Sequence, residues 1–422
     1  MTTAPTASAP APHPAAAPTC VRRDGPFLHS LEAARSLYIA TQIVATGPLI
    51  VGIVVFGWRS VVVAALAIAS CAAVEKAYYR CARTPALLGR SHAYLTGLLL
   101  ALTLPAFVPW YVPVVAAALT ILIGKAIFGG VGHFLWQPAL VGRLAVAVMF
   151  PLTMNPTAWP VLAPNRLLIG DIRLARPVEG YRQWSAHAAP PGADAFSLPR
   201  PSVLLGGLTA RTSPAYCGLA VKPPDAPRGT TLALLRMPPM TDLLYGATPG
   251  GIGETSAAAI ILAAVYLAYR GILKWQLPIA AILSAAAVAA VAPIYLAGPA
   301  QAVRTVWLPL TAEGLDVGAT YVCYQLLTGE LLLAATFLAT EMTSRPVTTG
   351  GQVIFGVGCG AIGMILKLYL QVPIPFYMGV LVMNTLTPAI DAVWRPRVLG
   401  QRWLPHRRIA NPAFVAEAPS AK

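Results

Sequence analysis

The chain has 422 residues, of which 57% are hydrophobic and only 11% are charged, and its mean hydropathy is +0.66. This composition excludes an ordinary soluble domain, and it gives many nearly uncharged windows of about 20 residues, the length that crosses a hydrocarbon core. The net charge of +15 does not indicate nucleic-acid binding, because excess Lys and Arg in a membrane protein mark cytoplasmic loops. The six cysteines form no C-x-x-C pair and indicate no metal site.

The N-terminal part of the chain is predicted to be a tail followed by a membrane domain. Residues 1–30 are rich in Ala and Pro, and we expect them to be disordered. Residues 31–152 form a first transmembrane half. Its five predicted helices are Ser36–Phe56, Ser60–Glu75, Tyr94–Phe107, Tyr111–Phe128 and Trp136–Pro151.

The C-terminal part begins with a long polar segment. Residues 153–250 are rich in Pro, Gly and Arg, and we predict one extramembrane loop there. Residues 251–396 form a second transmembrane half, and residues 397–422 form a basic cytoplasmic tail. The predicted helices of this half are Thr255–Tyr269, Leu277–Leu296, Tyr321–Thr340, Val353–Leu370 and Ile374–Trp394. The expected fold is an all-α polytopic membrane protein with about ten transmembrane helices.

The distribution of Lys and Arg predicts the orientation. Ten spans place both termini on one side, and that side receives most of the cationic residues of the short loops. The opposite short loops receive only Arg59 and Arg304. Both termini are therefore expected to be cytoplasmic, and the end of the long loop is expected to lie on the outer face.

The two halves also resemble each other in sequence. Three short matches occur in the same order, pairing Thr96–Leu102 with Thr328–Ala334, Ile127–Gly129 with Ile354–Gly356, and Gln137–Leu140 with Thr387–Ile390. Two repeats of five helices each must be inverted relative to one another in the membrane. The pattern therefore predicts a five-plus-five inverted repeat.

The stretch Asp242–Ser256 is the main candidate for chemistry. It places the hydroxyl of Thr248 after Gly246 and Ala247, six positions past the carboxylate of Asp242. Three glycines and then a helix start follow, which leaves unpaired N–H groups and the positive end of a helix dipole. We hypothesise that Thr248 carries a phosphate-linked cofactor. The alternative is that this Gly-rich stretch is only a turn into a membrane helix.

Four ionisable residues stand in or beside predicted spans. Glu330 falls near the middle of a span, where a carboxylate costs about 2.5 kcal/mol or more. It is either a relay for ions or protons, a hydrogen-bond partner of a cofactor, or a paired structural residue. Arg143 and Lys367 are expected to have structural roles, either reaching the membrane surface with their charged ends or pairing within the bundle. Glu254 is expected in the first turn of its helix, where it favours the helix dipole, and close to anything bound at Thr248.

Several motifs in the same order resemble the NqrB/RnfD family of membrane subunits. Asp242–Thr248 matches the D-x-x-[ST]-G-A-T flavinylation motif, with Tyr245 in place of Ser or Thr. Gly251–Ser256 looks like the G-x-[IL]-G-E-T-S segment that follows it. Further matches occur at Leu95–Pro105, Phe128–His133, Gln137–Leu140, Phe337–Pro346 and Met383–Asp391. Gln137 and Glu341 stand where the family has Asn and Asp.

The resemblance implies a membrane subunit of an Rnf or Na⁺-translocating NADH:quinone oxidoreductase complex in the bacterial plasma membrane. In that family a flavin transferase joins FMN through its phosphate to the last Thr of the motif, here Thr248. Asp242, Gly246 and Ala247 would form the recognition motif, and Glu254 would lie beside the cofactor. The resemblance also implies other subunits as partners, including a flavoprotein, and it allows a second, non-covalent flavin such as riboflavin.

Two other functions are compatible with the same pattern. One is a solute channel or transporter with the inverted-repeat architecture and no flavin. The other is a family member that carries no flavin and serves as a structural subunit. Within the family, the lack of an obvious N-terminal quinone-site segment favours an Rnf-type assignment. Among the departures from the family motifs Tyr245 matters most, since its bulky ring would either hinder the transferase or stack on the flavin.

Overall fold

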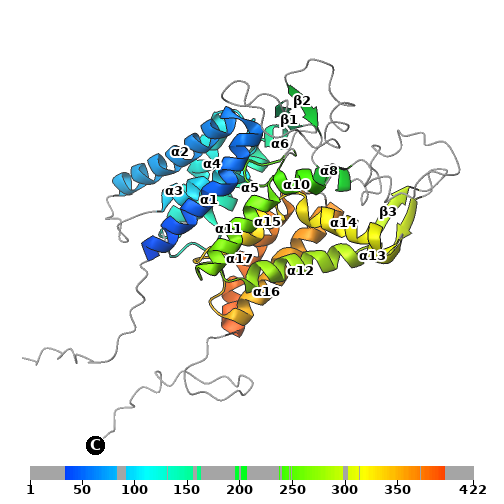
Figure 1. Ribbon diagram of the computed structural model, residues 1–422. Helices are drawn as coiled ribbons and strands as arrows, with labels where there is room; N and C mark the ends of the chain where they lie inside the picture. The colour runs from blue at the N-terminus through cyan, green and yellow to red at the C-terminus, as the bar shows by residue number, and fades with distance from the viewer. Residues whose placement is uncertain are drawn as a thin grey trace, which may run out of the picture.

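The computed structural model of the protein is a bundle of helices (Figure 1). It describes residues 34–82, 92–130, 132–154, 159–162, 195–198, 201–206, 237, 240–246, 248, 250–297, 303–312, 314–370 and 372–394. The predicted tails 1–30 and 397–422 lie outside these ranges, as does most of the predicted loop 153–250.

The first half contains five helical units at the predicted places. They are α1 (Ala34–Phe56), α2 (Trp58–Ala82), α3 (Ala93–Thr103), α4 (Tyr111–Ile121) with its π-helical end η1 (Leu122–Ala126), and α5 (Pro138–Met149). The third is shorter than predicted, because Pro105 lies just beyond its end, and helices usually end before a proline. The fifth stops before Pro151, which begins the single turn α6 (Pro151–Met154).

The second half also contains five helical units. They are α11 (Ala257–Tyr269), α12 (Gln276–Val291), the pair α14 (Leu315–Leu327) and α15 (Leu331–Leu333) with η3 (Ala334–Leu338), α16 (Thr349–Ile365) with η4 (Leu366–Leu370), and α17 (Pro375–Val393). The predicted continuous span Tyr321–Thr340 is wrong, because α14 and the α15–η3 segment meet at a bend of 59°.

Short elements outside these units correct the all-α expectation. Strands β1 (Trp159–Leu162) and β2 (Ala195–Leu198) form one antiparallel hairpin, and β3 (Ile294–Ala297) and β4 (Val303–Val306) form another. The predicted span Leu277–Leu296 therefore ends at Val291, where the chain turns into β3. Short helices α8 (Pro201–Gly206), α10 (Met240–Tyr245) and α13 (Pro309–Ala312) complete the described elements.

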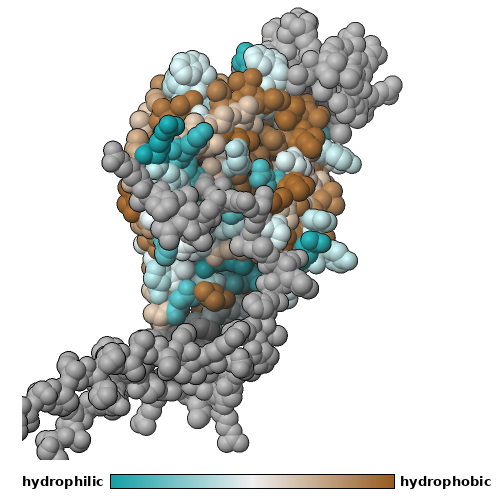
Figure 2. Space-filling view, turned by 90° about the vertical axis from the view of Figure 1, so that its left-hand side faces the viewer, coloured by the Kyte–Doolittle hydropathy of each residue, from teal (hydrophilic) through white to brown (hydrophobic). Residues whose placement is uncertain are grey.

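The long apolar helices and the exposed apolar side chains are those expected of a protein surrounded by lipid. Four helices in the described part of the chain, α1, α2, α16 with η4, and α17, are long and apolar enough to cross a membrane, or five if the bent pair counts as one span. On α11 the exposed residues Leu262, Val265 and Tyr269 recur at helical spacing. Apolar side chains also cover much of the face in Figure 2. The protein is therefore a polytopic membrane protein.

Close helix packing depends on small residues. Gly142 of α5 lies against Thr120 and Ala116 of α4, and Gly360 of α16 lies against Ala281 and Ser284 of α12. An added Cβ at either glycine would overlap those atoms. Small residues let helix backbones approach in this way where lipid provides no hydrophobic driving force between helices.

The three sequence matches between the halves fall at different points of the elements. Gly97 lies inside α3, whereas its counterpart Gly329 lies in the break before α15. Gln137 caps the start of α5, whereas its counterpart Thr387 lies inside α17. The matched segments therefore do not occupy equivalent structural positions.

A buried ion pair joins α2 to the end of α4. The Lys125 Nζ lies 2.8 Å from the Glu75 Oε1, and both side chains are almost fully buried. Buried charges are stable only while they stay paired, because burial removes their hydration. The π-helical turn η1 carries Lys125 and so places it against α2.

We expect Lys125→Met to destabilise the protein by about 3–5 kcal/mol, because it leaves the Glu75 carboxylate buried without its cation. The double variant Glu75→Gln/Lys125→Met is expected to recover most of the loss. Thermal unfolding of the purified chain in detergent measures both variants. Equal destabilisation of the single and double variants would show that the pair is not the source of the effect.

Candidate functional site

The first part of the candidate site is the turn that follows α10. Gly246 ends this helix with φ +95°, and its N–H donates to the Asp242 carbonyl at 2.8 Å. A Cβ on Gly246 would lie 3.0–3.2 Å from three atoms of Ser256. Glycine is the residue that adopts this left-handed conformation without strain, so the sequence requires Gly246 for local geometry.

The glycine-rich loop after Thr248 is fixed by backbone contacts with the first half. The Ile252 N–H donates to the Leu104 carbonyl at 2.9 Å, and the Gly253 N–H donates to the Leu102 carbonyl at 2.8 Å. Gly52 of α1 lies directly against the Ile252 carbonyl, where a Cβ would overlap it. The loop is therefore held between α1 and the C-terminal end of α3.

The buried side chain of Glu254 forms hydrogen bonds that hold this loop. Its Oε2 accepts a hydrogen bond from the Gly251 N–H at 3.1 Å, and its Oε1 accepts one from the Tyr377 hydroxyl at 2.6 Å. The expectation that it lies in the first turn of its helix is wrong, because α11 begins at Ala257 with Ser256 as its N-cap. Glu254 instead connects the loop to α17.

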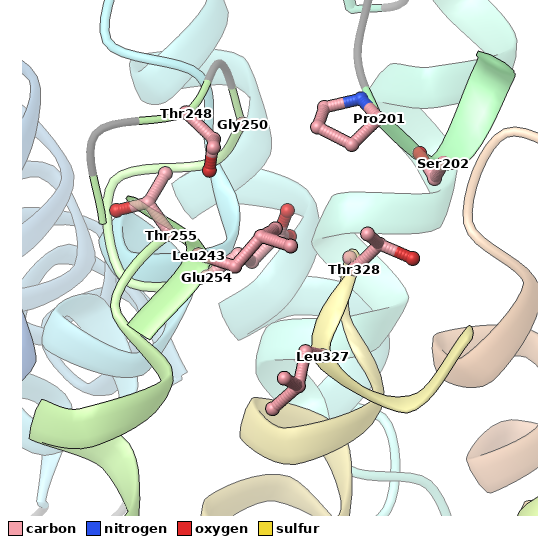
Figure 3. A pocket seen from close by; sticks show the side chains of 10 residues that line it. Pro201, Ser202, Leu243, Thr248, Gly250, Glu254, Thr255, Leu327 and Thr328 are labelled. Carbon is pink, nitrogen blue, oxygen red and sulfur yellow. The ribbon is translucent and has the colours of Figure 1, made fainter. Parts of the chain in front are cut away.

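Thr248 lies at a pocket between this loop and the break after α14. The open volume is about 280 Å³, and it is lined by Pro201, Ser202, Leu243, Thr248, Gly250, Glu254, Thr255, Leu327, Thr328 and Gly329. Figure 3 shows the Thr248 side chain on the loop side with its hydroxyl toward Glu254, and Thr328 on the opposite side. The pocket therefore joins the predicted site to a segment about 80 residues further along the chain.

Two buried polar atoms of the Asp242–Ser256 stretch have no partner in the described part of the chain, and one of them belongs to Thr255, which lines the pocket. The Asp242 Oδ2 and the Thr255 Oγ1 are buried and have no hydrogen-bond partner within the described residues. Burial raises the pKa of the Asp242 carboxyl from its ordinary 3.8 to about 6. Buried polar atoms without partners are uncommon in native proteins, and here they fit a site that receives a polar group.

Arg143 and Lys367 pair within the bundle, as predicted. The Arg143 Nε donates to the Thr103 carbonyl at the end of α3 at 3.0 Å. The Lys367 Nζ donates to the carbonyls of Gln325 and Thr328 at the end of α14. Glu330 is 3% exposed and occupies the residue position just before α15, without a side-chain hydrogen bond to that helix. It lies within electrostatic range of the Tyr377 hydroxyl, as do Glu254 and Arg143.

Comparisons with known proteins identify the family. Residues 21–400 match the family described as NQR2, RnfD, RnfE. The chain belongs to this family. The resemblance that the motifs indicate is therefore confirmed over nearly the whole chain.

Relatives of the chain include single subunits of three ion-translocating complexes. The relative from the ion-translocating oxidoreductase complex of Halorhodospira halophila is 30% identical, over 83% of this chain and 87% of the relative. The relative from the Na⁺-translocating ferredoxin:NAD⁺ oxidoreductase complex of Acetobacterium woodii is 28% identical, over 82% and 84%. The relative from the proton-translocating ferredoxin:NAD⁺ oxidoreductase complex of Clostridium ljungdahlii is 26% identical, over 89% and 95%.

Departures from the family motifs have structural explanations at two positions. Tyr245, in place of the Ser or Thr of the flavinylation motif, is 70% exposed and does not line the pocket. Gln137, in place of Asn, accepts a hydrogen bond from the Ala139 N–H at 2.7 Å and so caps α5. Ala247, the remaining predicted motif residue, lies outside the described residues.

Tyr377 is the site residue that sequence reasoning missed. It lies in α17, 123 residues from its partner Glu254, and it is fully buried. A tyrosine in an apolar span is too common to indicate such a contact. Its hydroxyl needs a partner when buried, and that requirement is the one signal that the sequence carries.

The raised pKa of Asp242 leads to a pH-dependent stability of α10. Below about pH 4 both states hold the proton, so the folded state keeps its full stability. Between about pH 4 and 6 the unfolded carboxyl loses its proton more readily than the folded one, so the stability falls as pH rises and the loss is complete above about pH 6. We expect α10 amides to be less protected from hydrogen exchange at pH 7 than at pH 5, after correction for intrinsic rates.

The variant Asp242→Asn is the control for this effect, because an amide does not titrate. The α10 amides of this variant are expected to be equally protected from hydrogen exchange at pH 5 and pH 7, after correction for intrinsic rates. A pH dependence as large in Asp242→Asn as in the wild type would assign the effect to another group.

Proposed function

We propose that this chain is the membrane subunit of an Rnf-type ion-translocating electron transport complex in a bacterial plasma membrane. Membership of the family over residues 21–400 carries this proposal, and the relatives named above are subunits of ion-translocating oxidoreductase complexes. The chain is therefore one component that works with the other subunits, and it is not catalytic alone.

The proposed cofactor is FMN attached covalently to Thr248. A phosphate ester at this hydroxyl would lie in the pocket that Thr255 also lines, and the Thr255 Oγ1 is buried without a hydrogen-bond partner within the described residues. The Thr255 hydroxyl is a suitable donor to a phosphate. When bound, FMN supplies reversible electron transfer, accepting electrons from a partner flavoprotein.

The protein's own residues keep the attachment point in place. Gly246 sets the direction of the chain after α10, and Glu254 with Tyr377 fixes the loop that follows Thr248. Thr248 itself is only 3% exposed. A flavin transferase therefore has to reach the hydroxyl before the loop is fully packed, and the exposed Tyr245 ring does not obstruct the pocket.

A second, non-covalent flavin has a candidate position away from Thr248. Two adjoining cavities with open volumes of about 400 and 330 Å³ share Tyr38, Leu95 and Glu341. The Tyr38 ring stacks on His92 at 3.8 Å, which offers a flat aromatic surface to a planar ligand. Burial raises the pKa of the Glu341 carboxyl to about 7.

The proposed topology has ten spans in two inverted sets of five, with cytoplasmic termini and Thr248 on the outer face. The helix contacts support the two sets of five. The second helix of each half packs on the third and fourth of the same half: α2 packs on α3 and α4, and α12 packs on α14 and α16. In Figure 1 the start of α1 and the end of α17 lie toward one end of the bundle, and α8 and α10 lie toward the other. The Lys and Arg bias of the short loops favours the same orientation.

Co-expression with a flavin transferase tests the attachment. We expect the denatured wild-type chain to fluoresce on a gel and Thr248→Ala to be dark, because the phosphate ester needs that hydroxyl. Thr255→Ala is the matched control, since its hydroxyl belongs to the same pocket, and it is expected to fluoresce. Tyr245→Thr, which restores the family motif, is expected to fluoresce as well.

Other outcomes would identify a different function. A dark wild-type band from folded protein would support the structural subunit without flavin, or a solute channel or transporter. Fluorescence retained in Thr248→Ala would place the flavin on another residue.

A further inference from the structure

An exposed arginine lies at the turn between α1 and α2. Helix α1 ends at Phe56 and α2 begins at Trp58, so Arg59 stands in the first turn of α2. Its side chain is exposed, and no carboxylate among the described residues pairs with it. Most cations of the short loops lie on the other side of the proposed topology, and Arg59 is one of two exceptions. This position therefore calls for an anion that the described part of the chain does not supply.

Two aromatic rings hold the Arg59 guanidinium. Its Cζ lies 5.4 Å from the centroid of the Phe107 ring and 6.0 Å from that of the Trp58 ring. Phe107 is itself held by the buried Phe56, whose ring it meets edge-on at 6.3 Å. A cation near an aromatic face is attracted by the quadrupole of the ring. The guanidinium is thus placed against the protein, while its N–H groups donate no hydrogen bond to the described residues.

More aromatic side chains gather at the same end of the first half. The rings of Trp110 and Tyr111, at the start of α4, are 6.1 Å apart, and the Tyr111 ring lies 5.6 Å from that of Phe150, just after α5. Trp58 is 55% exposed and Trp110 is 70% exposed. Exposed Trp and Tyr residues at the ends of membrane helices mark the membrane–water interface. Arg59 therefore lies at the level of the lipid head groups.

Exposed apolar side chains continue from this aromatic cluster along the helices. Val54 precedes the end of α1, and Val62 follows Arg59 by three residues, which places both on one face of α2. Met149 ends α5 just before Phe150 and is exposed as well. The surface thus presents a cation framed by rings at head-group level and apolar side chains deeper in the membrane.

We propose that Arg59 and its aromatic neighbours bind an anionic phospholipid of the outer leaflet. The guanidinium donates two hydrogen bonds to the phosphate diester, an arrangement that arginine suits better than lysine. The acyl chains lie along the exposed apolar side chains of α1 and α2. A zwitterionic head group is disfavoured, because its ammonium is repelled by the guanidinium.

Charge and apolar surface together select a lipid as the occupant. An acidic protein segment matches the charge of Arg59, but it has no acyl chains to cover the apolar side chains beside it. The proposed topology supplies only the choice of leaflet. The site involves neither Thr248 nor its flavin.

The test compares the full-length wild type with Arg59→Gln, both purified in detergent and washed free of lipid. Native mass spectrometry measures the retention of added phosphatidylglycerol, with phosphatidylcholine of the same acyl chains as the reference lipid. We expect the wild type to bind phosphatidylglycerol about fivefold more tightly than Arg59→Gln, the factor for losing one cation at an anionic lipid surface. Phosphatidylcholine is expected to bind equally weakly to both.

Two further variants identify the source of the effect. Arg59→Lys keeps the charge and loses the bidentate geometry, so its affinity for phosphatidylglycerol is expected between those of the wild type and Arg59→Gln. The matched control is Lys274→Gln, which removes an exposed cation between α11 and α12 and is expected to bind as the wild type does. All these positions are exposed, so the variants are expected to keep the Tm of the wild type.

Three results would overturn the proposal. One is equal retention of phosphatidylglycerol by Arg59→Gln and Lys274→Gln. Another is a wild type that holds phosphatidylcholine as tightly as phosphatidylglycerol. The third is displacement of phosphatidylglycerol by an equal concentration of inorganic phosphate, which would show a simple anion site. None of these readouts requires flavin, so their failure is distinct from a failure of the Thr248 proposal.

Discussion

Two helices of this protein end inside an apolar body, and the pairing of their terminal carbonyls determines the interior. Arg143 satisfies the end of α3, and Lys367 satisfies the end of α14. An unsatisfied carbonyl in such surroundings is costly, so each helix end requires donors from elsewhere in the chain, and here a cationic side chain is among them. The cations come from α5 and η4, so these elements are fixed relative to the breaks.

The candidate site lies between the end of α3, which contacts the glycine-rich loop, and the end of α14. Backbone carbonyls just before and after the end of α3 accept hydrogen bonds from the glycine-rich loop, and the end of α14 forms the opposite side of the pocket. Glu254 and Tyr377 connect that loop to α17. The loop that carries Thr248 is thus held by backbone contacts with the first half, whereas the opposite side of the pocket comes from the second half.

The sequence predicts the helices well because long apolar runs have few alternatives in a membrane protein. All ten predicted ranges contain helix in the structure, and Thr248 and Glu254 line the same pocket. The predicted helix Tyr321–Thr340 runs through the break, although Thr328, Gly329 and Glu330 interrupt the apolar run there. The stability of the break depends on Lys367, about 40 residues away, and no local pattern reports such a contact. The role of Glu254 was misjudged for the same reason, because its partner Tyr377 is distant in sequence.

The central proposal is that this family member carries its flavin on Thr248, in a pocket between the glycine-rich loop and the break after α14. Peptide mass spectrometry of the chain purified from its native membrane tests it most directly. The account predicts that the peptide containing Thr248 is heavier by one FMN less one water, with fragments that locate the addition on Thr248. An unmodified Thr248 peptide recovered in full, or an addition located on another residue such as Thr255, would contradict it.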